Sequence, residues 1–374
     1  MTIAALQIGD HVMRPATEVS TALQSVARLL VVFLMLPINS IAPQKGPQKP
    51  GSQPLVIEGQ GSFYIGGRVK HTTATSGSQE DSSAMEDDIM VDQMYVQYQV
   101  PQNHGTRIPV VMVHGCCLSG KTWETTPDGR MGWSEYFLRR GRPVYIPDQT
   151  SRGRSGFDAT AINQARLGTA APGSIPQVFT VGRNEAWKSF RLGPEYPKPF
   201  PDEQFPVSAF DELAKQLIPD LNATLPKPNP TFANLAALGV LLKGAVLMGH
   251  SESGFFPERA ALVDAAGVRG IISIEGYCPT KLPSGAVAVL ARIPILLVFA
   301  DHLSDIPEIP GARALADCRT FVRQVVDAGG DAMVLHLPEA GMKGNSHMLM
   351  QDLNNLQIAD LILAWIDKHV ERSR

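Results

Sequence analysis

The chain has 374 residues, of which 44% are hydrophobic and 18% charged, and this mixed composition excludes long disordered or fibrous architectures as descriptions of the whole chain. Its 33 lysines and arginines against 36 aspartates and glutamates give a net charge of −3 with no basic cluster, so nothing indicates nucleic-acid binding. The length suits two domains or one elaborated α/β domain.

The N-terminal region contains an unbroken apolar run of eight residues, Leu29–Leu36. Because a bilayer-spanning helix needs about 20 apolar residues, we expect no stable membrane anchor here. The run fits the hydrophobic region of a secretory signal peptide, with Ser40–Ala42 as a small-x-small cleavage site. We therefore expect residues 1–42 to be a signal peptide and the protein to be secreted or periplasmic. Initiation at Met13 would give a more ordinary leader, and a hydrophobic helix packed on the domain is the alternative.

Strand patterns dominate the next part of the chain. We expect strands at Phe63–Val69 and Met94–Val100, separated by a loop over Thr72–Asp92, because that stretch is too acidic and serine-rich to bury. Short runs rich in Val, Ile and Leu then recur between Gly, Pro or Asp residues, as is typical of strands buried on both faces of a parallel sheet. These runs are Ile108–Val113, Pro143–Ile146, Ala245–Met248, Gly270–Ile274, Ile293–Ala300 and Ala332–Leu337.

Helical patterns alternate with the later runs, at Glu258–Ala266, Ala312–Ala328 and Leu356–Val370. Such alternation predicts an α/β fold with a mostly parallel, doubly wound sheet. We expect residues 43–156 to form the N-terminal part of this core and residues 236–374 its C-terminal part.

The segment between these two parts breaks the pattern. From Phe157 to Pro230 it contains eleven prolines, together with several aromatic residues. A structureless loop of this length is improbable in a compact domain, so we expect residues 157–235 to fold over the sheet as a cap insertion. The alternative is a surface elaboration that does not contact the functional site.

Gly115–Thr122 matches the G-x-x-x-x-G-K-[ST] pattern of a phosphate-binding loop and follows a predicted strand. A phosphate loop must open directly into a helix, because the helix N-terminus forms part of the anion site. Here the following residues, Trp123–Gly129, have poor helix propensity and contain Pro127. A P-loop NTPase is therefore the less favoured alternative.

The second motif, Gly249–Gly254 (GHSESG), follows a predicted strand and precedes a helical pattern. A serine between small residues at a strand-to-helix turn is typical of a nucleophile elbow, which makes Ser251 the candidate nucleophile. Ser253 stands where the G-x-S-x-G pattern has its final glycine.

A serine hydroxyl needs an imidazole to accept its proton and a carboxylate to orient that imidazole, in the chain order Ser, acid, His for this fold class. His347 follows the last predicted strand and is the candidate base. Glu275 and Asp301 each follow a strand after the nucleophile, and spacing alone does not decide between them. We expect His302, beside Asp301, to pack or face solvent, and His114 to shape its turn by hydrogen bonding.

The loop after Ile108–Val113 is the candidate oxyanion loop, with backbone N–H groups of Cys116 and Glu252 as donors. Cys116 and Cys117 are adjacent, and their Cα atoms, about 3.8 Å apart, are closer than the roughly 4.4–6.8 Å of ordinary disulfides. A bond between them would be strained. Two packed thiols, or pairing of either residue with Cys278 or Cys318, are the alternatives.

Four motifs together resemble an α/β-hydrolase family of bacterial esterases: His114–Gly120 (HGCCLSG), Gly249–Gly254, Ser273–Gly276 (SIEG) and Gly344–His347 (GNSH). That family carries consecutive, disulfide-bonded cysteines in the oxyanion loop and a Ser-His-Glu triad. The resemblance covers Phe63 to the C-terminus. It implies Ser251 as nucleophile, His347 as base and Glu275 as acid, an oxyanion hole formed by Cys116 and Glu252, and Cys116–Cys117 and Cys278–Cys318 bonds. Members usually carry Gln at the position of Glu252.

The sequence thus predicts a serine carboxylic-ester hydrolase that forms an acyl-enzyme on a small or medium apolar ester. Lactonase, amidase or lyase chemistry on the same triad is the alternative. We expect no cofactor, because no metal-ligand spacing or dinucleotide fingerprint occurs. A small-molecule ester is the expected partner, and a homodimer stays open as the assembly state.

Overall fold

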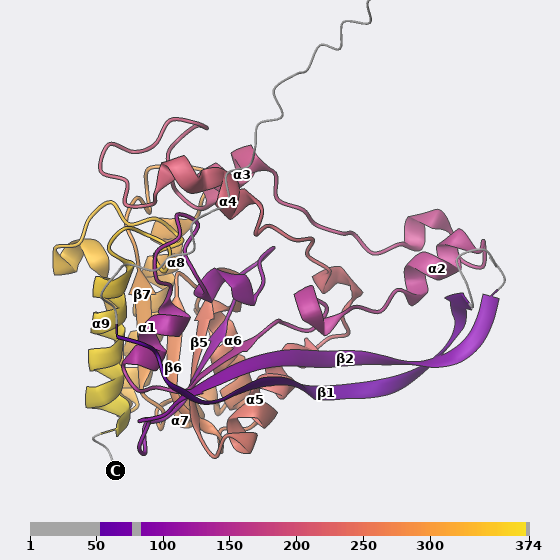
Figure 1. Cartoon of the computed structure of the whole chain (residues 1–374), viewed down its shortest axis with the longest axis horizontal. Helices are drawn as coiled ribbons and strands as arrows, with labels where there is room; N and C mark the ends of the chain where they lie inside the picture. The colour runs from indigo at the N-terminus through magenta and orange to yellow at the C-terminus, as the bar shows by residue number, and fades with distance from the viewer. Residues whose placement is uncertain (1–52, 77–83, 372–374) are drawn as a thin grey trace, which may run out of the picture. The chain divides into compact units, whose positions relative to one another are not determined.

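The structure is a computed structural model that describes residues 53–76 and 84–371. These residues form an eight-stranded sheet with the order β1-β2-β4-β3-β5-β6-β7-β8 (Figure 1). The signal peptide expected at residues 1–42 lies outside them. The strands are β1 (Ile57–Ser76), β2 (Ala84–Pro101), β3 (Val110–Val113), β4 (Val144–Pro147), β5 (Ala245–His250), β6 (Val268–Ile274), β7 (Ile295–Phe299) and β8 (Ala332–His336).

The strands from β4 to β8 are parallel, whereas β1 pairs with β2, and β2 with β4, in antiparallel fashion. This arrangement confirms the predicted mostly parallel, doubly wound sheet and is the α/β-hydrolase fold. All six apolar runs that were predicted as buried strands form strands β3 to β8, with bounds that differ by at most two residues at either end.

Helices cover both faces of the sheet. Successive residues of β3 point to opposite faces, so that Val110 and Met112 pack in one buried cluster and Val111 and Val113 in the other. The first cluster includes side chains of α1 and α9, which lie together in Figure 1, and the second includes side chains of α5, α6, α7 and α8. The helices are α1 (Trp133–Arg139), α2 (Thr160–Arg166), α3 (Arg183–Ser189), α4 (Phe210–Ala214), α5 (Pro230–Leu241), α6 (Phe256–Val263), α7 (Ala286–Leu290), α8 (Gly311–Asp327) and α9 (Asn355–Ile366).

Short 3-10 turns connect many of these elements, and a π-helical turn follows α9. The 3-10 turns are η1 (Gly120–Trp123), η2 (Gly153–Ser155), η3 (Pro172–Ser174), η4 (Val207–Ala209), η5 (Asn222–Thr224), η6 (Ser251–Phe255) and η7 (Leu337–Ala340), and the π-helical turn is η8 (Asp367–Glu371). No helix among the described residues is both long and apolar enough to cross a membrane.

The prediction of a loop over Thr72–Asp92 is wrong for most of that range, because β1 runs to Ser76 and β2 begins at Ala84. β2 pairs with β4 only over Val96–Gln99, and the rest of the β1–β2 hairpin extends beyond the sheet as a two-stranded ribbon (Figure 1). The acidic residues Glu86, Asp87 and Asp88 of β2 are exposed, so an acidic sequence is compatible with strand structure here.

Residues 157–230 contain only short helices. α2 packs against β1 beside the ribbon, where Lys70 and Asp158 form an ion pair of 2.5 Å. α3 and α4 lie together at another place in the fold (Figure 1). α5 crosses the boundary expected at residue 235 and packs against α6, β1 and β2, so it is part of the helical layer.

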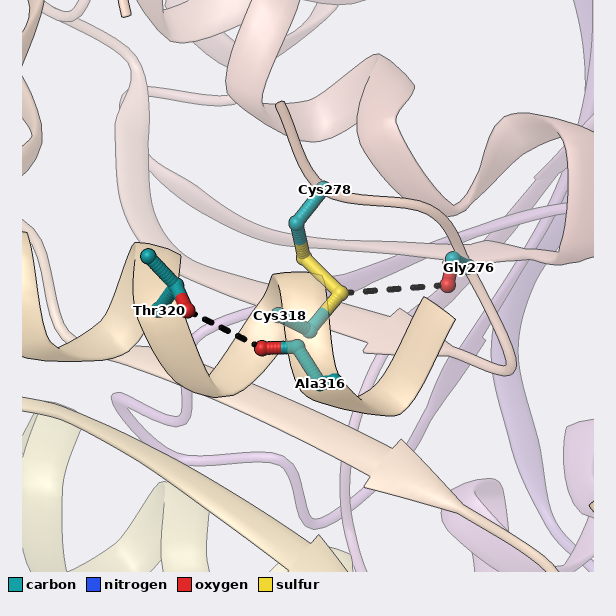
Figure 2. The surroundings of a disulfide bond; sticks show 5 residues. All are labelled: Gly276, Cys278, Ala316, Cys318 and Thr320. Atoms are coloured by element: carbon teal, nitrogen blue, oxygen red, sulfur yellow. Dashed lines mark hydrogen bonds between the residues drawn. A yellow bond between two sulfur atoms is a disulfide. The ribbon is translucent and has the colours of Figure 1, made fainter. Parts of the chain in front are cut away.

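A disulfide joins Cys278, in the loop after β6, to Cys318 in the middle of α8 (Figure 2). The Cα atoms of the two residues are 4.9 Å apart, and the pairing implied by the family resemblance is confirmed. The bond ties the loop that follows Glu275 to a long helix of the core.

Candidate active site

Ser251 lies at the turn between β5 and η6 and has a φ of +56°, a left-handed conformation that is unusual for a residue other than glycine. The glycines beside it are required by close packing: a Cβ atom at Gly249 would lie 1.9 Å from the Ser253 carbonyl oxygen, and one at Gly254 would lie 2.4 Å from Gly276 Cα. This strained, tightly packed turn is the geometry of a nucleophile elbow.

Ser253 does more than replace a glycine. Its fully buried hydroxyl accepts a hydrogen bond of 2.9 Å from the backbone N–H of His250 and donates to the Val113 carbonyl oxygen over 3.0 Å. The side chain therefore links the elbow to the end of β3, from which the loop carrying Cys116 starts.

His347 reaches the elbow from the loop after β8. Its Nε2 lies 2.8 Å from Ser251 Oγ, and its backbone N–H donates to the Phe190 carbonyl oxygen over 2.9 Å. Gly344 allows the loop to approach Asp202, because a Cβ atom there would lie 1.8 Å from the Asp202 carbonyl oxygen. His347 and its loop are thus held by two residues of the 157–235 segment.

Glu275 directly follows β6 and completes the constellation. Its Oε2 lies 2.8 Å from His347 Nδ1, and its Oε1 accepts a hydrogen bond from the backbone N–H of Ala300. Burial alone would raise the pKa of Glu275, but the Arg191 guanidinium and the hydrogen bond from His347 outweigh it and hold that pKa at about 2. The environment of Glu275 therefore favours its ionised carboxylate.

Arg191, which the sequence reasoning did not single out, is part of the same cluster. It is 2% exposed, its Nη2 donates to Glu275 Oε2 over 2.5 Å, and its Nη1 lies 3.3 Å from His347 Nδ1. Its Nε donates to the Asp301 carbonyl oxygen over 2.9 Å. An isolated arginine in a loop-rich segment gives no sequence signal of such a role.

The carboxylate of Asp301, the other candidate acid, binds backbone groups and not an imidazole. It accepts hydrogen bonds from the backbone N–H groups of His302, over 2.8 Å, and Gly344, over 3.0 Å. The structure brings Glu275, and not Asp301, to the imidazole of His347.

Burial lowers the pKa of His347 below its usual 6.5; the Glu275 carboxylate raises it and Arg191 lowers it further. The neighbouring His250 is fully buried, and burial together with His347 lowers its pKa to about 3. A neutral His250 donates from Nε2 to the His347 carbonyl oxygen over 2.9 Å, so it holds the loop that carries His347.

The candidate oxyanion loop packs directly on the elbow. A Cβ atom at Gly115 would lie 2.9 Å from Ser251 Cβ, and Cys116 lines the same cavity as Ser251 and His347. His114 shapes this turn as predicted: its Nδ1 donates to the Gly115 carbonyl oxygen and its Nε2 accepts from the Gln149 N–H. Burial, followed by the charge of Arg152, lowers the pKa of His114 to about 4, so the ring is neutral.

Cys116 and Cys117 are thiols in this structure, with sulfur atoms 2.7 Å apart, so the bond expected between them is not formed here. Cys117 has a φ of +59°, a left-handed backbone conformation, and the two sulfur atoms lie side by side. The Cys116 thiol donates to Asp220 Oδ2 over 3.3 Å. The contact with Cys117 and burial raise the pKa of Cys116 well above its usual range.

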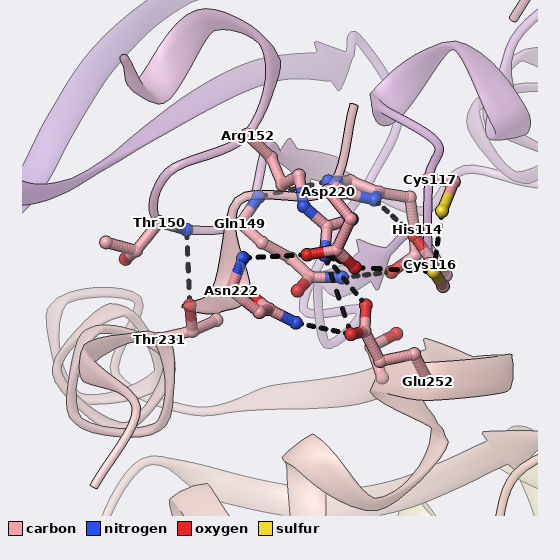
Figure 3. A network of polar contacts seen from close by, with 12 residues as sticks. His114, Cys116, Cys117, Gln149, Thr150, Arg152, Asp220, Asn222, Thr231 and Glu252 are labelled. Carbon is pink, nitrogen blue, oxygen red and sulfur yellow. Dashed lines mark hydrogen bonds and ion pairs between the residues drawn. The ribbon is translucent and has the colours of Figure 1, made fainter. Parts of the chain in front are cut away.

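The side chain of Glu252 belongs to a polar network on one side of the elbow (Figure 3). The side chain of Arg152 is fully buried, and its Nη2 lies 3.2 Å from Glu252 Oε2. Arg152 also forms an ion pair with Asp220, and the Asn222 side chain donates a hydrogen bond to Glu252 Oε1. Burial raises the pKa of Glu252, whereas Arg152 lowers it and Asp220 raises it. Arg152 thus compensates the negative charge beside the candidate oxyanion site.

The phosphate-loop alternative is wrong on geometry. The helical turn at the end of the motif is η1 (Gly120–Trp123), which is only four residues long. The Gly120 N–H donates to Asp148 Oδ1 over 2.7 Å instead of facing a free anion site. Lys121 Nζ donates to the Thr125 carbonyl oxygen over 2.7 Å, and Asp148 pairs with Arg154. These contacts use the groups that a nucleotide phosphate would need.

A cavity of about 190 Å³ opens over Ser251 and His347. The 157–235 segment contributes Phe179, Val181 and Phe190 to its wall. The region after β7 contributes further apolar side chains, namely Leu303, Ile309, Pro310 and Ala314. The wall is mainly apolar and includes the polar groups of Ser251 and His347, together with Glu185 and Ser189 from α3, as in pockets that take an apolar ligand with a few polar contacts.

Comparison with known proteins gives two informative similarities, although no protein-family model matches the chain. A solved structure described as a novel bacterial esterase superposes with a TM-score of 0.81, is 47% identical, and matches 86% of this chain and 99% of its own. The curated probable secreted lipase phiG, from a fungal species (strain ATCC 74256), is 26% identical over 354 residues, which cover 82% of this chain and 89% of the lipase. Both similarities span most of the chain.

Proposed function

The chain belongs to the α/β-hydrolase family of bacterial esterases and is a carboxylic-ester hydrolase, and from that premise we propose that Ser251, His347 and Glu275 form its catalytic triad. The observation that carries the proposal is the continuous chain of hydrogen bonds from Glu275 Oε2 through His347 to Ser251 Oγ, with two contacts of 2.8 Å. Nucleophile, base and orienting acid are the three parts that acyl transfer by a serine requires.

In the first half of the reaction Ser251 Oγ attacks the ester carbonyl carbon, and His347 Nε2 takes the hydroxyl proton. His347 then gives this proton to the departing alkoxide, so that an alcohol leaves and the acyl group stays on Ser251. Glu275 keeps Nδ1 protonated and stabilises the imidazolium that forms between these steps. A water molecule, deprotonated by the same Nε2, releases the carboxylic acid in the second half.

We assign the oxyanion hole to the backbone N–H groups of Cys116 and Glu252. The support is positional: Gly115 packs against Ser251, and Glu252 directly follows it at the start of a 3-10 turn. Each such donor is typically worth about 10²–10³ in rate. With Arg152 and Asn222 holding its carboxylate, Glu252 can supply its N–H without its charge opposing the oxyanion.

Residues 157–235 act as the cap in this proposal. Phe179, Val181 and Phe190 supply apolar wall to the cavity over Ser251, and Arg191 binds the triad acid. A small or medium apolar acyl or alcohol group fits such a wall, so we propose apolar esters of that size as substrates. Hydrolysis of amides and lactones is the alternative use of the same groups, and rates on matched ester, amide and lactone panels separate them.

We propose that residues 1–42 direct secretion or periplasmic export. In that oxidising compartment, Cys116 and Cys117 would form a disulfide bond with each other. The support is the secreted relative, the Cys278–Cys318 disulfide, and the closeness of the two thiols at 2.7 Å. Mass spectrometry of non-reduced protein from the oxidising compartment tests this pair. A peptide lighter by two hydrogens than the dithiol supports the bond, and two alkylatable thiols contradict it.

The acyl-enzyme itself is tested by rapid kinetics on a p-nitrophenyl ester. The proposal predicts a burst of p-nitrophenolate that approaches one equivalent per protein when deacylation is slower than acylation, and no burst with Ser251→Ala. Ser189→Ala, which changes a serine hydroxyl in the cavity wall, is the matched control and should retain turnover. A full burst in the Ser251→Ala protein contradicts the assignment.

A further inference from the structure

A second cluster of potential ligand groups lies beside the loop that carries His347. It contains Asp202 from the 157–235 segment and Asp301 and His302 from the end of β7, and one ligand atom of each lies within 4.8 Å of the other two. None of these residues takes part in the triad contacts. The cluster is separate in chemistry from the site that attacks the ester.

His302 is oriented as metal-binding histidines are. Its side chain is 8% exposed and stacks on Phe200, with ring centroids 3.8 Å apart. Its Nδ1 lies 2.7 Å from Asp305 Oδ2, and in the tautomer that donates from Nδ1 to this carboxylate the Nε2 lone pair is available to an ion. A carboxylate that fixes the second ring nitrogen is the usual outer-shell partner of a histidine ligand.

Nε2 of His302 points into the cluster without making a hydrogen bond. The atom is buried, and although Asp202 Oδ1 is 3.2 Å away, the contact does not have hydrogen-bond geometry. Two ligands of one ion, each at about 2.1 Å from it, are separated by about 3.0–3.4 Å for octahedral to tetrahedral angles. The 3.2 Å between His302 Nε2 and Asp202 Oδ1 is compatible with this range.

Asp301 provides the third group. Its Oδ1 accepts a hydrogen bond from the His302 backbone N–H over 2.8 Å, and its Oδ2 accepts one from the Gly344 backbone N–H over 3.0 Å. Each carboxylate oxygen that accepts one N–H retains a second lone pair. Asp202 is 49% exposed, so its side chain can adjust its position to an ion without disturbing the core.

We propose that Asp202, Asp301 and His302 bind one divalent transition-metal ion of the Zn²⁺ class, with Asp305 as outer-shell partner. One imidazole and two carboxylates favour such an ion over Mg²⁺ or Ca²⁺, which prefer oxygen ligands alone. A cavity of about 580 Å³ lined by Asp301, His302 and Asp305 lies beside the cluster, and Asp202 is 49% exposed on its own side.

The bound ion would tie the proposed cap to the loop of the base. Asp202 abuts Gly344, and Gln204 donates its backbone N–H to the Gly344 carbonyl oxygen over 2.8 Å. Asp301 also bonds the Gly344 N–H. An ion held by Asp202 and Asp301 would therefore reinforce the same contact, between the 157–235 segment and the loop around Gly344, that these hydrogen bonds make.

Titration of the full-length protein with Zn²⁺, followed by calorimetry and by thermal unfolding, tests the site. The expected result is one equivalent bound and a raised Tm, both lost in His302→Gln and in Asp202→Asn. Asp305→Asn should weaken binding by about 10–100-fold, the usual effect of losing an outer-shell partner. Asp202 is exposed, so the second variant reports on binding even if His302→Gln folds poorly.

His104→Gln is the matched control, because His104 pairs with a carboxylate, Glu58, at 3.6 Å on another part of the surface. It should bind Zn²⁺ as the unchanged protein does. The proposal is overturned if the unchanged protein does not bind Zn²⁺, or if Asp202→Asn and His302→Gln bind it with unchanged affinity. Repeating the titration in Ser251→Ala protein keeps the result independent of catalysis.

Discussion

Arg191 and His347 bind the same oxygen atom of Glu275: Arg191 Nη2 lies 2.5 Å and His347 Nδ1 lies 2.8 Å from Oε2. The arginine comes from the 157–235 segment and the histidine from the loop after β8. One buried carboxylate oxygen therefore joins the proposed cap to the proposed base, and Arg191 is a positioning residue in this arrangement.

Replacement of Arg191 by Met should lower kcat/KM by about 10–100-fold, since a hydrogen bond to a charged group contributes about 1.5–3 kcal/mol. Arg191 lowers the pKa of His347, so its removal raises that pKa. Because His347 acts as a base when neutral, the acidic limb of the kcat/KM–pH profile should move to higher pH.

Arg183→Met, on the exposed side of α3, is the control for this effect and should leave the profile in place. Arg191→Lys, which keeps the charge, should restore part of the pH profile. An unchanged acidic limb in Arg191→Met would show that the arginine supports only the fold.

Glu275→Gln and Asp301→Asn separate the two candidate acids. Glu275→Gln leaves the wrong imidazole tautomer opposite Ser251 and should lower kcat by up to about 10⁴-fold, as loss of the triad acid does in serine proteases. Asp301→Asn keeps an oxygen for the Gly344 N–H and should cost far less. Steady-state rates of the two variants decide, and the assignment of Glu275 is wrong if only Asp301→Asn abolishes turnover.

The unchanged enzyme should keep its activity into mildly acidic solution. Burial lowers the pKa of His347 below 6.5, so the base remains neutral as the pH falls through that value. We expect kcat/KM to reach half its maximum below pH 6.5, measured on a substrate without titrating groups. A midpoint above pH 6.5 contradicts the assigned environment of His347.

Glu203 should make the fold less stable at alkaline pH. Burial and the charge of Asp352 raise its pKa to about 9, and its buried Oε2 makes no hydrogen bond. The folded state therefore holds a proton that the unfolded state releases near the ordinary pKa of about 4.3. This contribution to stability is complete below the unfolded pKa and is lost as the pH rises through about 9.

Glu203→Gln should remove that contribution to the pH dependence of the unfolding free energy, measured by urea denaturation between neutral and alkaline pH. Glu212→Gln, at a surface carboxylate paired with Lys215, is the control and should retain the slope. Equal slopes in all three proteins would show that Glu203 is not held protonated.

The chain order and placement of Ser251, Glu275 and His347 were predictable, because each follows a strand recognisable from its apolar run. The choice of Glu275 over Asp301 was not predictable from spacing, since both groups end neighbouring strands. In the structure it depends on side-chain contacts: Glu275 Oε2 meets His347 Nδ1, while Asp301 binds backbone N–H groups.

Arg191, His250 and Ser253 were missed as supports of the site for a related reason. Their hydrogen bonds go to Glu275, to the His347 carbonyl and to the Val113 carbonyl, partners that are far away in sequence. The strands predicted at Phe63–Val69 and Met94–Val100 lie within β1 and β2, but the outer part of the ribbon was predicted as a loop because its acidic sequence lacks the apolar alternation of a half-buried strand. Cross-strand pairing outside the sheet does not require that alternation.

Labelling with a fluorophosphonate, followed by peptide mapping, tests the central claim most directly, because only a serine activated by a neighbouring base reacts rapidly with this reagent. The account predicts one modified residue, Ser251, with labelling abolished in Ser251→Ala and strongly slowed in His347→Ala. Labelling at another residue, or undiminished labelling of the folded Ser251→Ala protein, would contradict it.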